Sequence, residues 1–122
     1  YVADHCDALY SVILNGKNGE TYNIGGNQEK NNLEIVSAIC KILDDKIPSN
    51  KIDSYKELIT FVKDRPGHDF RYAVDTSKIK KHLNWSPRYT FEDGIKKTID
   101  WYIKYKDWWK NLYSSERLGN LK

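Results

Sequence analysis

Residues 64–69 read DRPGHD and bring an arginine, a histidine and two acidic residues together around a proline–glycine pair. Proline fixes φ near −65° and glycine tolerates a positive φ, so Pro66 and Gly67 predict a type II turn. Arg65 and His68 are the corner residues of that turn, whose Cα atoms lie within about 7 Å of each other. Both side chains can therefore converge on one group, and their chemistry suits an anion. A turn with its charges in water is the alternative that these residues leave open.

Other patterns that could do chemistry fail on their spacing or context. Tyr102 and Lys106 match Y-x-x-x-K, a known proton-transfer pair, but no glycine-rich phosphate loop follows a strand upstream of them. The consecutive residues Asp4 to Cys6, DHC, point in different directions on a helix and cannot form a catalytic triad. The histidines show no metal-ligand spacing: His5, His68 and His82. We therefore expect no catalytic residue, no cofactor-binding residue and no metal ligand in this chain.

The elements that must position the DRPGHD turn predict an α/β arrangement. The run LITFVK, rich in β-branched and aromatic residues, predicts a strand that leads straight into the turn. GETYNIGG and RYAVD predict two further short extended segments. Asn32 precedes the apolar run LEIVSAICKIL and is the expected N-cap of a buried helix.

Three more helices are expected from capping residues and apolar periodicity. Asp4 is the expected N-cap of a helix that ends near Asn15, with a buried stripe of Cys6, Leu9, Tyr10, Ile13 and Leu14. Asp75 is expected to cap a short helix that stops at Asn84. Thr90 and Asp93 resemble a capping box that opens a helix with one apolar face, made of Phe91, Ile95, Ile99, Tyr102 and Ile103.

The composition limits the class of protein. With 122 residues and 39% apolar content, the chain is one domain or a piece of two, and no run approaches the ~20 apolar residues of a membrane span. The net charge of +3 is spread with mixed signs and gives nucleic-acid binding little support. The chain opens without methionine or an apolar leader, which favours a piece of a longer protein and no signal peptide. Cys6 and Cys40 lack C-x-x-C spacing, which favours buried thiols and a cytoplasmic location.

The C-terminal region is rich in aromatic residues that resemble a base-stacking platform. Their helical spacing favours packing in a core or an interface instead: Trp101, Tyr102, Tyr105, Trp108, Trp109 and Tyr113. A nucleic-acid-binding domain therefore stays a minor alternative, and it predicts association that depends strongly on salt.

Several segments together resemble one enzyme family: YVADHCDAL, GETYNIGG, NNLEIV, ITFVKDRPGHDFRYAVD, LNWSP and GIKKTIDWY. They are similar to the C-terminal third of the dTDP-glucose 4,6-dehydratases, which are extended short-chain dehydrogenases/reductases. The likeness runs from Tyr1 to about Tyr102 and continues weakly through SSERLG at residues 114–119. LNWSP and TIDWY are shared widely among extended sugar-nucleotide enzymes, whereas DRPGHD followed by RYAVD is the specific part.

The resemblance implies an NAD-dependent lyase of deoxysugar biosynthesis that converts dTDP-glucose to its 4-keto-6-deoxy product with loss of water. In that family the NAD loop and the catalytic residues lie upstream of the matched region, so NAD would be bound by a domain absent from this sequence. The implied fold of residues 1–122 is the nucleotide-sugar-binding C-terminal lobe, helices with a few short strands. Residues 1–26 would finish elements of the cofactor domain. The longer protein would be a homodimer without nucleic-acid or membrane partners.

The site residues that the resemblance implies lie on the matched motifs. The positions matching the stretch that lines the nucleotide diphosphate are Asp64, Arg65, Pro66, Gly67 and His68. Asn32 matches the asparagine at a helix start that also contacts the nucleotide. Carboxylates repel phosphate, so Asp64 or Asp69 is expected to orient Arg65 or Arg71. Two alternatives are a non-catalytic nucleotide-sugar-binding or interaction module, and another extended sugar-nucleotide epimerase or dehydratase.

Overall fold

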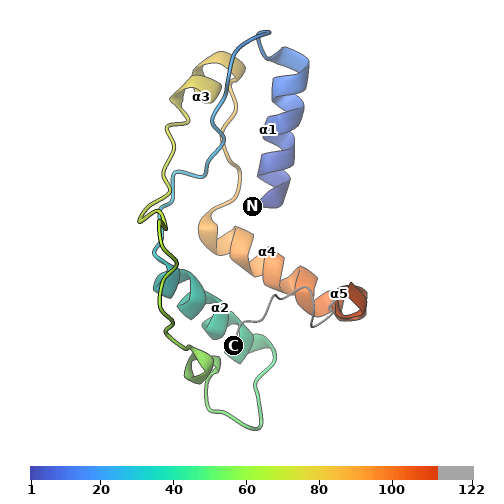
Figure 1. Cartoon of the computed structure of the whole chain (residues 1–122). Coiled ribbons are helices and arrows are strands. Elements are labelled where there is room, and N and C mark those ends of the chain that lie inside the picture. Colours follow the sequence, from blue (N-terminus) through green and yellow to red (C-terminus); the bar gives the residue numbers. More distant parts are fainter. Residues whose placement is uncertain (113–122) are drawn as a thin grey trace.

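The chain consists of helices joined by long extended segments, and a computed structural model describes residues 1–112 (Figure 1). The described elements are α1 (Val2–Asn15), α2 (Asn32–Lys46), the 3₁₀-helix η1 (Tyr55–Leu58), α3 (Ser77–Leu83), α4 (Phe91–Lys104) and α5 (Lys106–Leu112). Within this range, no helix has the length and apolar character needed to cross a membrane. Tyr113 and the similarity at residues 114–119 lie outside the described residues.

Two groups of helices lie toward opposite ends of an elongated molecule (Figure 1). α1 contacts α3 at one end, and α2 contacts α4 and η1 toward the other. Two extended segments, residues 17–31 and 59–76, run between these ends in opposite directions. They lie side by side, because Asn23 Nδ2 donates to the carbonyl of Asp75 at 3.2 Å. This arrangement brings the start of α2 close to the DRPGHD segment.

The strands predicted from GETYNIGG, LITFVK and RYAVD do not form among the described residues, although these segments are extended. A strand needs a neighbour whose backbone groups pair with its own, and the two adjacent extended segments make no such ladder. Their contacts use side chains instead, as Asn27 Nδ2 donates to Thr76 Oγ1 at 2.8 Å. Gly25 lies so close to Val74 that a Cβ would come within 2.8 Å of its Cγ2. The described region is therefore helical, and the short strands predicted for it are absent from residues 1–112.

The start of α2 differs from the prediction by one residue. The N-cap is Asn31, whose Oδ1 accepts from the amide of Glu34 at 2.9 Å. Glu34 Oε2 in turn accepts from the amide of Asn31 at 2.8 Å, which completes a capping box. Glu34 stands three residues after Asn31, which is the spacing of a capping box, so Asn31 is the N-cap. Asn32 is the first residue of the helix, and the prediction that it caps α2 is wrong.

α1 also begins earlier than predicted, with Tyr1 at the N-cap position and Val2 as the first helical residue. Asp4 is therefore inside the first turn, and its side chain is buried. Its two carboxylate oxygens accept from the amides of Arg88 and Tyr89, each at 3.1 Å. A contact across more than eighty residues, which no local pattern predicts, thus replaces the expected capping role of Asp4.

The remaining predicted caps agree better with the structure. Thr90 Oγ1 accepts from the amide of Asp93 at 3.1 Å at the start of α4, which confirms that cap. Asp75 accepts from the amide of Ser77 at 2.8 Å, but the N-cap position of α3 is Thr76. The interaction predicted for Asp75 therefore exists, one residue outside the position assigned to it.

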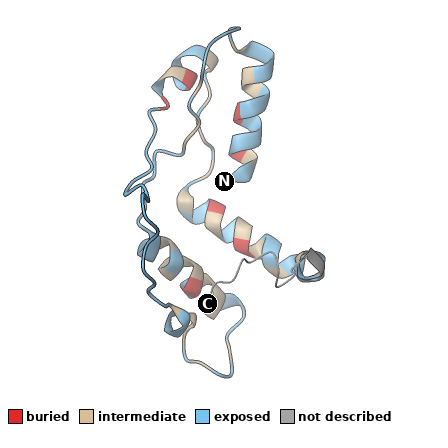
Figure 2. Cartoon of the chain, in the orientation of Figure 1, coloured by how far each residue is buried: buried red, intermediate tan, exposed pale blue. Residues whose placement is uncertain are grey.

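Among the described residues few are buried, and most are exposed or half-buried (Figure 2). The buried apolar residues are Ala8, Cys40, Ile79 and Ile99. α1 buries its side with Asp4 and Ala8, while Ile13, predicted to be core, is 78% exposed. The whole predicted stripe of α1 is exposed: Cys6, Leu9, Tyr10, Ile13 and Leu14. The prediction of buried cysteines is thus confirmed for Cys40 and wrong for Cys6.

The aromatic residues of α4 and α5 pack largely against one another. The ring centroid of Trp101 lies 5.2 Å from those of Tyr102 and Tyr105 and 5.4 Å from that of Trp108. These rings nevertheless remain exposed. The prediction of core packing is therefore wrong for these four rings, which pack against one another at the surface, and their packing in an interface stays a prediction.

Candidate functional site

A groove of about 730 Å³ lies between the start of α2 and the segment that contains the DRPGHD turn. Two stretches of chain line it, and their residues are Glu29, Lys30, Asn31, Asn32, Ile35, Asp64, His68, Asp69, Phe70, Arg71 and Tyr72. We call this the α2 groove. It brings Asn32 together with Asp64 and His68, which lie far apart in the sequence.

The DRPGHD segment forms the predicted turn, with Pro66 and Gly67 at its centre. Gly67 has φ of +69°, which confirms the left-handed conformation that a type II turn requires of its third residue. A Cβ at Gly67 would meet no other atom within 4 Å. The constraint on this position is therefore one of backbone conformation and not of space.

The carboxylate of Asp64 contacts two other residues of the turn, Arg65 and His68. Its Oδ1 accepts from the amide of Arg65 at 2.8 Å and lies 2.6 Å from His68 Nδ1. The hydrogen bond from His68 is the main reason that the pKa of Asp64 lies below its ordinary value, and the amide of Arg65 lowers it further. The carboxylate thus holds the imidazole by one nitrogen while both side chains line the α2 groove.

Arg65 and Arg71 have different places in the structure. Arg65 is exposed and lies outside the lining of the α2 groove, so its contact with an anion stays a prediction. Arg71 lines the groove and pairs with Glu29, which belongs to the adjacent extended segment. The hydrogen bond with Glu29 raises the pKa of Arg71 above its ordinary value. The expectation that Asp64 or Asp69 orients a guanidinium is wrong for Arg71, because Glu29 has that role.

The N-terminal end of α2 forms one wall of the groove. Asn32 is exposed there, and among residues 1–112 its side chain makes no hydrogen bond. The amides in a helix's first turn carry partial positive charge and favour an anion. Lys30 lies beside them and pairs with Glu92 of α4 at 3.6 Å. Neither Lys30 nor Glu29 belongs to a sequence motif, so only the folding of the extended segments brings them to the groove.

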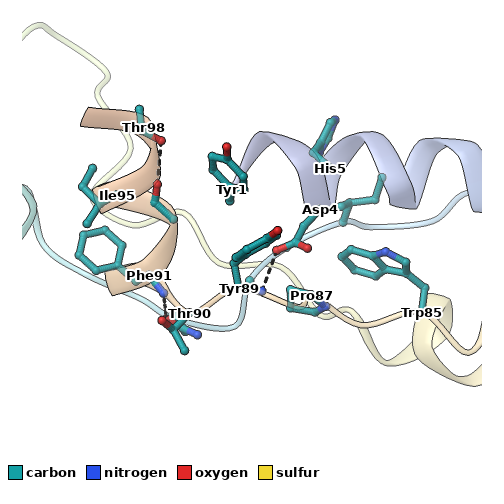
Figure 3. A pocket seen from close by; sticks show the side chains of 15 residues that line it. Tyr1, Asp4, His5, Trp85, Pro87, Tyr89, Thr90, Phe91, Ile95 and Thr98 are labelled. Atoms are coloured by element: carbon teal, nitrogen blue, oxygen red, sulfur yellow. Dashed lines mark hydrogen bonds between the residues drawn. The ribbon is translucent and has the colours of Figure 1, made fainter. Parts of the chain in front are cut away.

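A second cavity, of about 330 Å³, lies between the start of α1 and the start of α4 (Figure 3). Tyr1 and Tyr89 meet there edge to face with ring centroids 5.0 Å apart. Two of its polar side chains are paired, since Asp4 accepts from two amides and Thr98 donates to the carbonyl of Gly94 at 2.8 Å. This cavity lies where two helices begin, whereas the α2 groove is lined by Asn32, Asp64 and His68, which the resemblance implies as site residues.

Solved structures define the class of this fold. The described region resembles the dTDP-glucose 4,6-dehydratase of Bacillus anthracis in complex with NAD, with a TM-score of 0.76 and 45% identity over 92% of this chain and 32% of that one. The dTDP-glucose 4,6-dehydratase of Streptomyces venezuelae, with NAD bound, gives a TM-score of 0.74 and 35% identity over 91% of this chain and 32% of that one. The chain thus has the fold of one part of a sugar-nucleotide 4,6-dehydratase.

Sequence comparison gives the family. The family described as GDP-mannose 4,6 dehydratase matches residues 1–98, and the chain belongs to it. A dTDP-glucose 4,6-dehydratase of Escherichia coli is 52% identical over 98% of this chain and 34% of its own length. The enzyme of the same name from Neisseria meningitidis is 51% identical over 98% of this chain and 35% of its own. The chain therefore spans about a third of the length of these curated relatives.

Proposed function

We propose that residues 1–122 are the nucleotide-sugar-binding part of an NAD-dependent dTDP-glucose 4,6-dehydratase. The observation that carries this proposal is the convergence of Asn32 with Asp64 and His68 on the α2 groove. All three belong to motifs that resemble the nucleotide-contacting segments of these enzymes. The relatives named above, at about 50% identity, support the substrate class.

The α2 groove has the chemistry and size for a nucleoside diphosphate. Backbone amides of the first turn of α2, together with Lys30 and Arg71, supply donors, and Tyr72 and Phe70 supply aromatic surface. A smaller hollow of about 340 Å³ shares Glu29, Lys30, Ile35 and Tyr72 with it and extends along residues 25–28. The two together offer room on either side of a diphosphate for a nucleoside and a sugar.

NAD would be held outside the described residues. A dinucleotide site needs glycines at the turn from a strand into a helix, where backbone can approach the pyrophosphate. The paired glycines Gly25 and Gly26 stand well before α2, and Gly25 packs against Val74. These residues do not fit the cofactor, so we assign none of them to it. Residues 1–26 would complete the cofactor domain, as the resemblance implies.

The reaction belongs to the longer protein in this proposal. The dehydratase converts dTDP-glucose to dTDP-4-keto-6-deoxyglucose with loss of water, in the cytoplasm and as a homodimer. We expect the 122-residue chain alone to convert none of this sugar nucleotide, even with NAD added. Formation of the 4-keto product by the purified chain would contradict that expectation.

The binding role is tested by titrating ¹⁵N-labelled chain with dTDP and following its amide resonances. We expect shifts confined to residues 29–35 and 64–72, which line the α2 groove. The amides of η1 (Tyr55–Leu58), which lies near Asp44 in the C-terminal part of α2 and away from the groove, serve as the internal control. Thymidine, which lacks the diphosphate, should give much smaller shifts. An absence of shifts with dTDP, or shifts centred on η1, would contradict the proposal.

A further inference from the structure

The contact between His68 and Asp64 determines what the other edge of the imidazole can do. His68 Nδ1 lies 2.6 Å from Asp64 Oδ1, and a carboxylate only accepts hydrogen bonds. Nδ1 therefore carries a proton. A neutral imidazole has only one N–H, so its Nε2 is then an acceptor. Nε2 becomes a donor only when His68 is doubly protonated.

The charged groups that face His68 leave the groove acidic when His68 is neutral. Its lining carries three carboxylates, Glu29, Asp64 and Asp69, against two cations, Lys30 and Arg71. Both cations already have acidic partners, in Glu92 for Lys30 and Glu29 for Arg71. Tyr72 is the other titratable group of the lining, and Arg65 stands outside it. A diphosphate entering this lining would meet excess negative charge and the lone pair of Nε2.

We propose that a nucleoside diphosphate binds the α2 groove together with one proton, which His68 takes up from solvent at Nε2. The imidazolium then donates to a phosphate oxygen from Nε2 and to Asp64 from Nδ1. Asp64 is the positioning residue, because it fixes the N–H at Nδ1 and leaves Nε2 to receive the added proton. This inference rests on the proposed function, since it needs the diphosphate in this groove.

Linked protonation has a measurable consequence. When binding takes up one proton, affinity falls by up to about tenfold for each unit by which the pH rises. A ligand hydroxyl that donated to a neutral Nε2 would instead bind without a proton. The pH dependence therefore distinguishes a phosphate at Nε2 from a hydroxyl there.

Calorimetric titration of dTDP into the full chain, in several buffers of different ionisation enthalpy, counts the protons taken up. Across titrations at several pH values, we expect proton uptake to pass through a maximum of about one proton per dTDP bound. Binding with no proton uptake would overturn this inference and leave the proposed function standing. A complete absence of dTDP binding at every pH would overturn the proposed function and this inference with it.

Three variants assign the proton. His68→Gln keeps an amide donor that needs no added proton, so dTDP binding should persist with uptake lost. Asp64→Ala frees Nδ1 and lets the neutral ring carry its proton on Nε2, so uptake should fall well below one. Asp69→Ala, the matched control, removes a carboxylate from the same lining without touching His68, and uptake should stay at about one. Undiminished uptake in His68→Gln, or equal losses in both aspartate variants, would overturn the assignment.

Discussion

Asp64 illustrates how a carboxylate can belong to a groove for which we propose an anionic ligand. Its Oδ1 accepts from the amide of Arg65 and lies 2.6 Å from His68 Nδ1, so the carboxylate fixes the conformation of the turn. Glu29 forms an ion pair with Arg71 and thereby holds that guanidinium in place. Both acids hold the donors in place, and the exposed side chain of Arg65, with no ion pair among residues 1–112, is free to reach a ligand.

Replacing Arg65 tests whether its guanidinium reaches the diphosphate. Arg65→Lys keeps the positive charge but loses the paired donors that match two phosphate oxygens. We expect dTDP binding to weaken by about 1–3 kcal/mol, while folding stability stays unchanged. Calorimetric titration measures the affinity, and Arg88→Lys, which lies outside the α2 groove, is the control. Unaltered dTDP affinity in Arg65→Lys would show that the Arg65 side chain lies in water and does not contact the diphosphate.

The conformation of Gly67 can be tested against a second glycine of the same kind. Gly67 and Gly19 both have positive φ, +69° and +81°, and a Cβ at either would meet nothing within 4 Å. Alanine at either position should therefore lower stability by about 1 kcal/mol through backbone strain alone. Only Gly67→Ala should also weaken dTDP binding, because it turns His68 away from the groove. Thermal unfolding and dTDP titration of both variants check this, and equal affinities would contradict it.

At the level of elements, Asp44 joins η1 to α2. Its Oδ1 accepts from the amide of Tyr55 at 2.8 Å, and its Oδ2 accepts from Ser54 Oγ at 2.7 Å. The amide of Tyr55 is the main reason that the pKa of Asp44 lies below its ordinary value, and the hydroxyl of Ser54 lowers it further. The ionised carboxylate thus stabilises the junction that returns the chain toward the DRPGHD turn.

This junction should weaken in acid. Because the pKa of Asp44 is lower in the folded chain than in the unfolded one, its stabilisation is present above the ordinary carboxyl range. It is lost as pH falls through the lowered value. Asp44→Ala should reduce stability at neutral pH and flatten the acid dependence, whereas Asp45→Ala, its exposed neighbour, should do neither. Urea midpoints between about pH 2 and 7 measure this. Equal effects of the two substitutions would contradict it.

Local signals predict elements that are stabilised locally. The Thr90 cap and the left-handed Gly67 need only neighbouring residues, and both predictions are confirmed. The cap of α2 is Asn31 and not the predicted Asn32, because Glu34 stands three residues after Asn31 and completes the capping box. The strands could not be judged from their own residues, since a β-ladder depends on a partner segment, and among residues 1–112 LITFVK meets none.

At the level of the whole molecule, the sequence predicts some of the residues that line the candidate site and misses others. Asn32, Asp64 and His68 lie on motifs, so the sequence identified them. Glu29, Lys30 and Arg71 line the groove because two extended segments run side by side, and neither charge pattern nor periodicity reports that arrangement. Asp4 is a similar case, since its partners at Arg88 and Tyr89 are set by the long-range path of the chain.

The exposed face of α1 predicts how the isolated chain behaves in solution. Val2, Leu9, Tyr10, Ile13 and Leu14 are between 46% and 78% exposed and lie on the side opposite Ala8. A continuous apolar helix face of this kind favours association, because covering it removes apolar surface from water. We expect the 122-residue chain to self-associate reversibly, and sedimentation velocity over a range of concentrations measures the extent.

Substitution on this face separates the α1 surface from other exposed apolar residues. Ile13→Lys puts a charge at the centre of the face and should shift the chain toward monomer, since burying an unpaired charge opposes association. Asn15→Lys adds the same charge to the end of the same helix without removing an apolar side chain, and should leave association unchanged. Ile13 is 78% exposed, so neither substitution disturbs packing within the chain, and thermal unfolding should be the same for both. A chain that is monomeric at high concentration, or one that associates equally in both variants, would show that this face is not the associating surface.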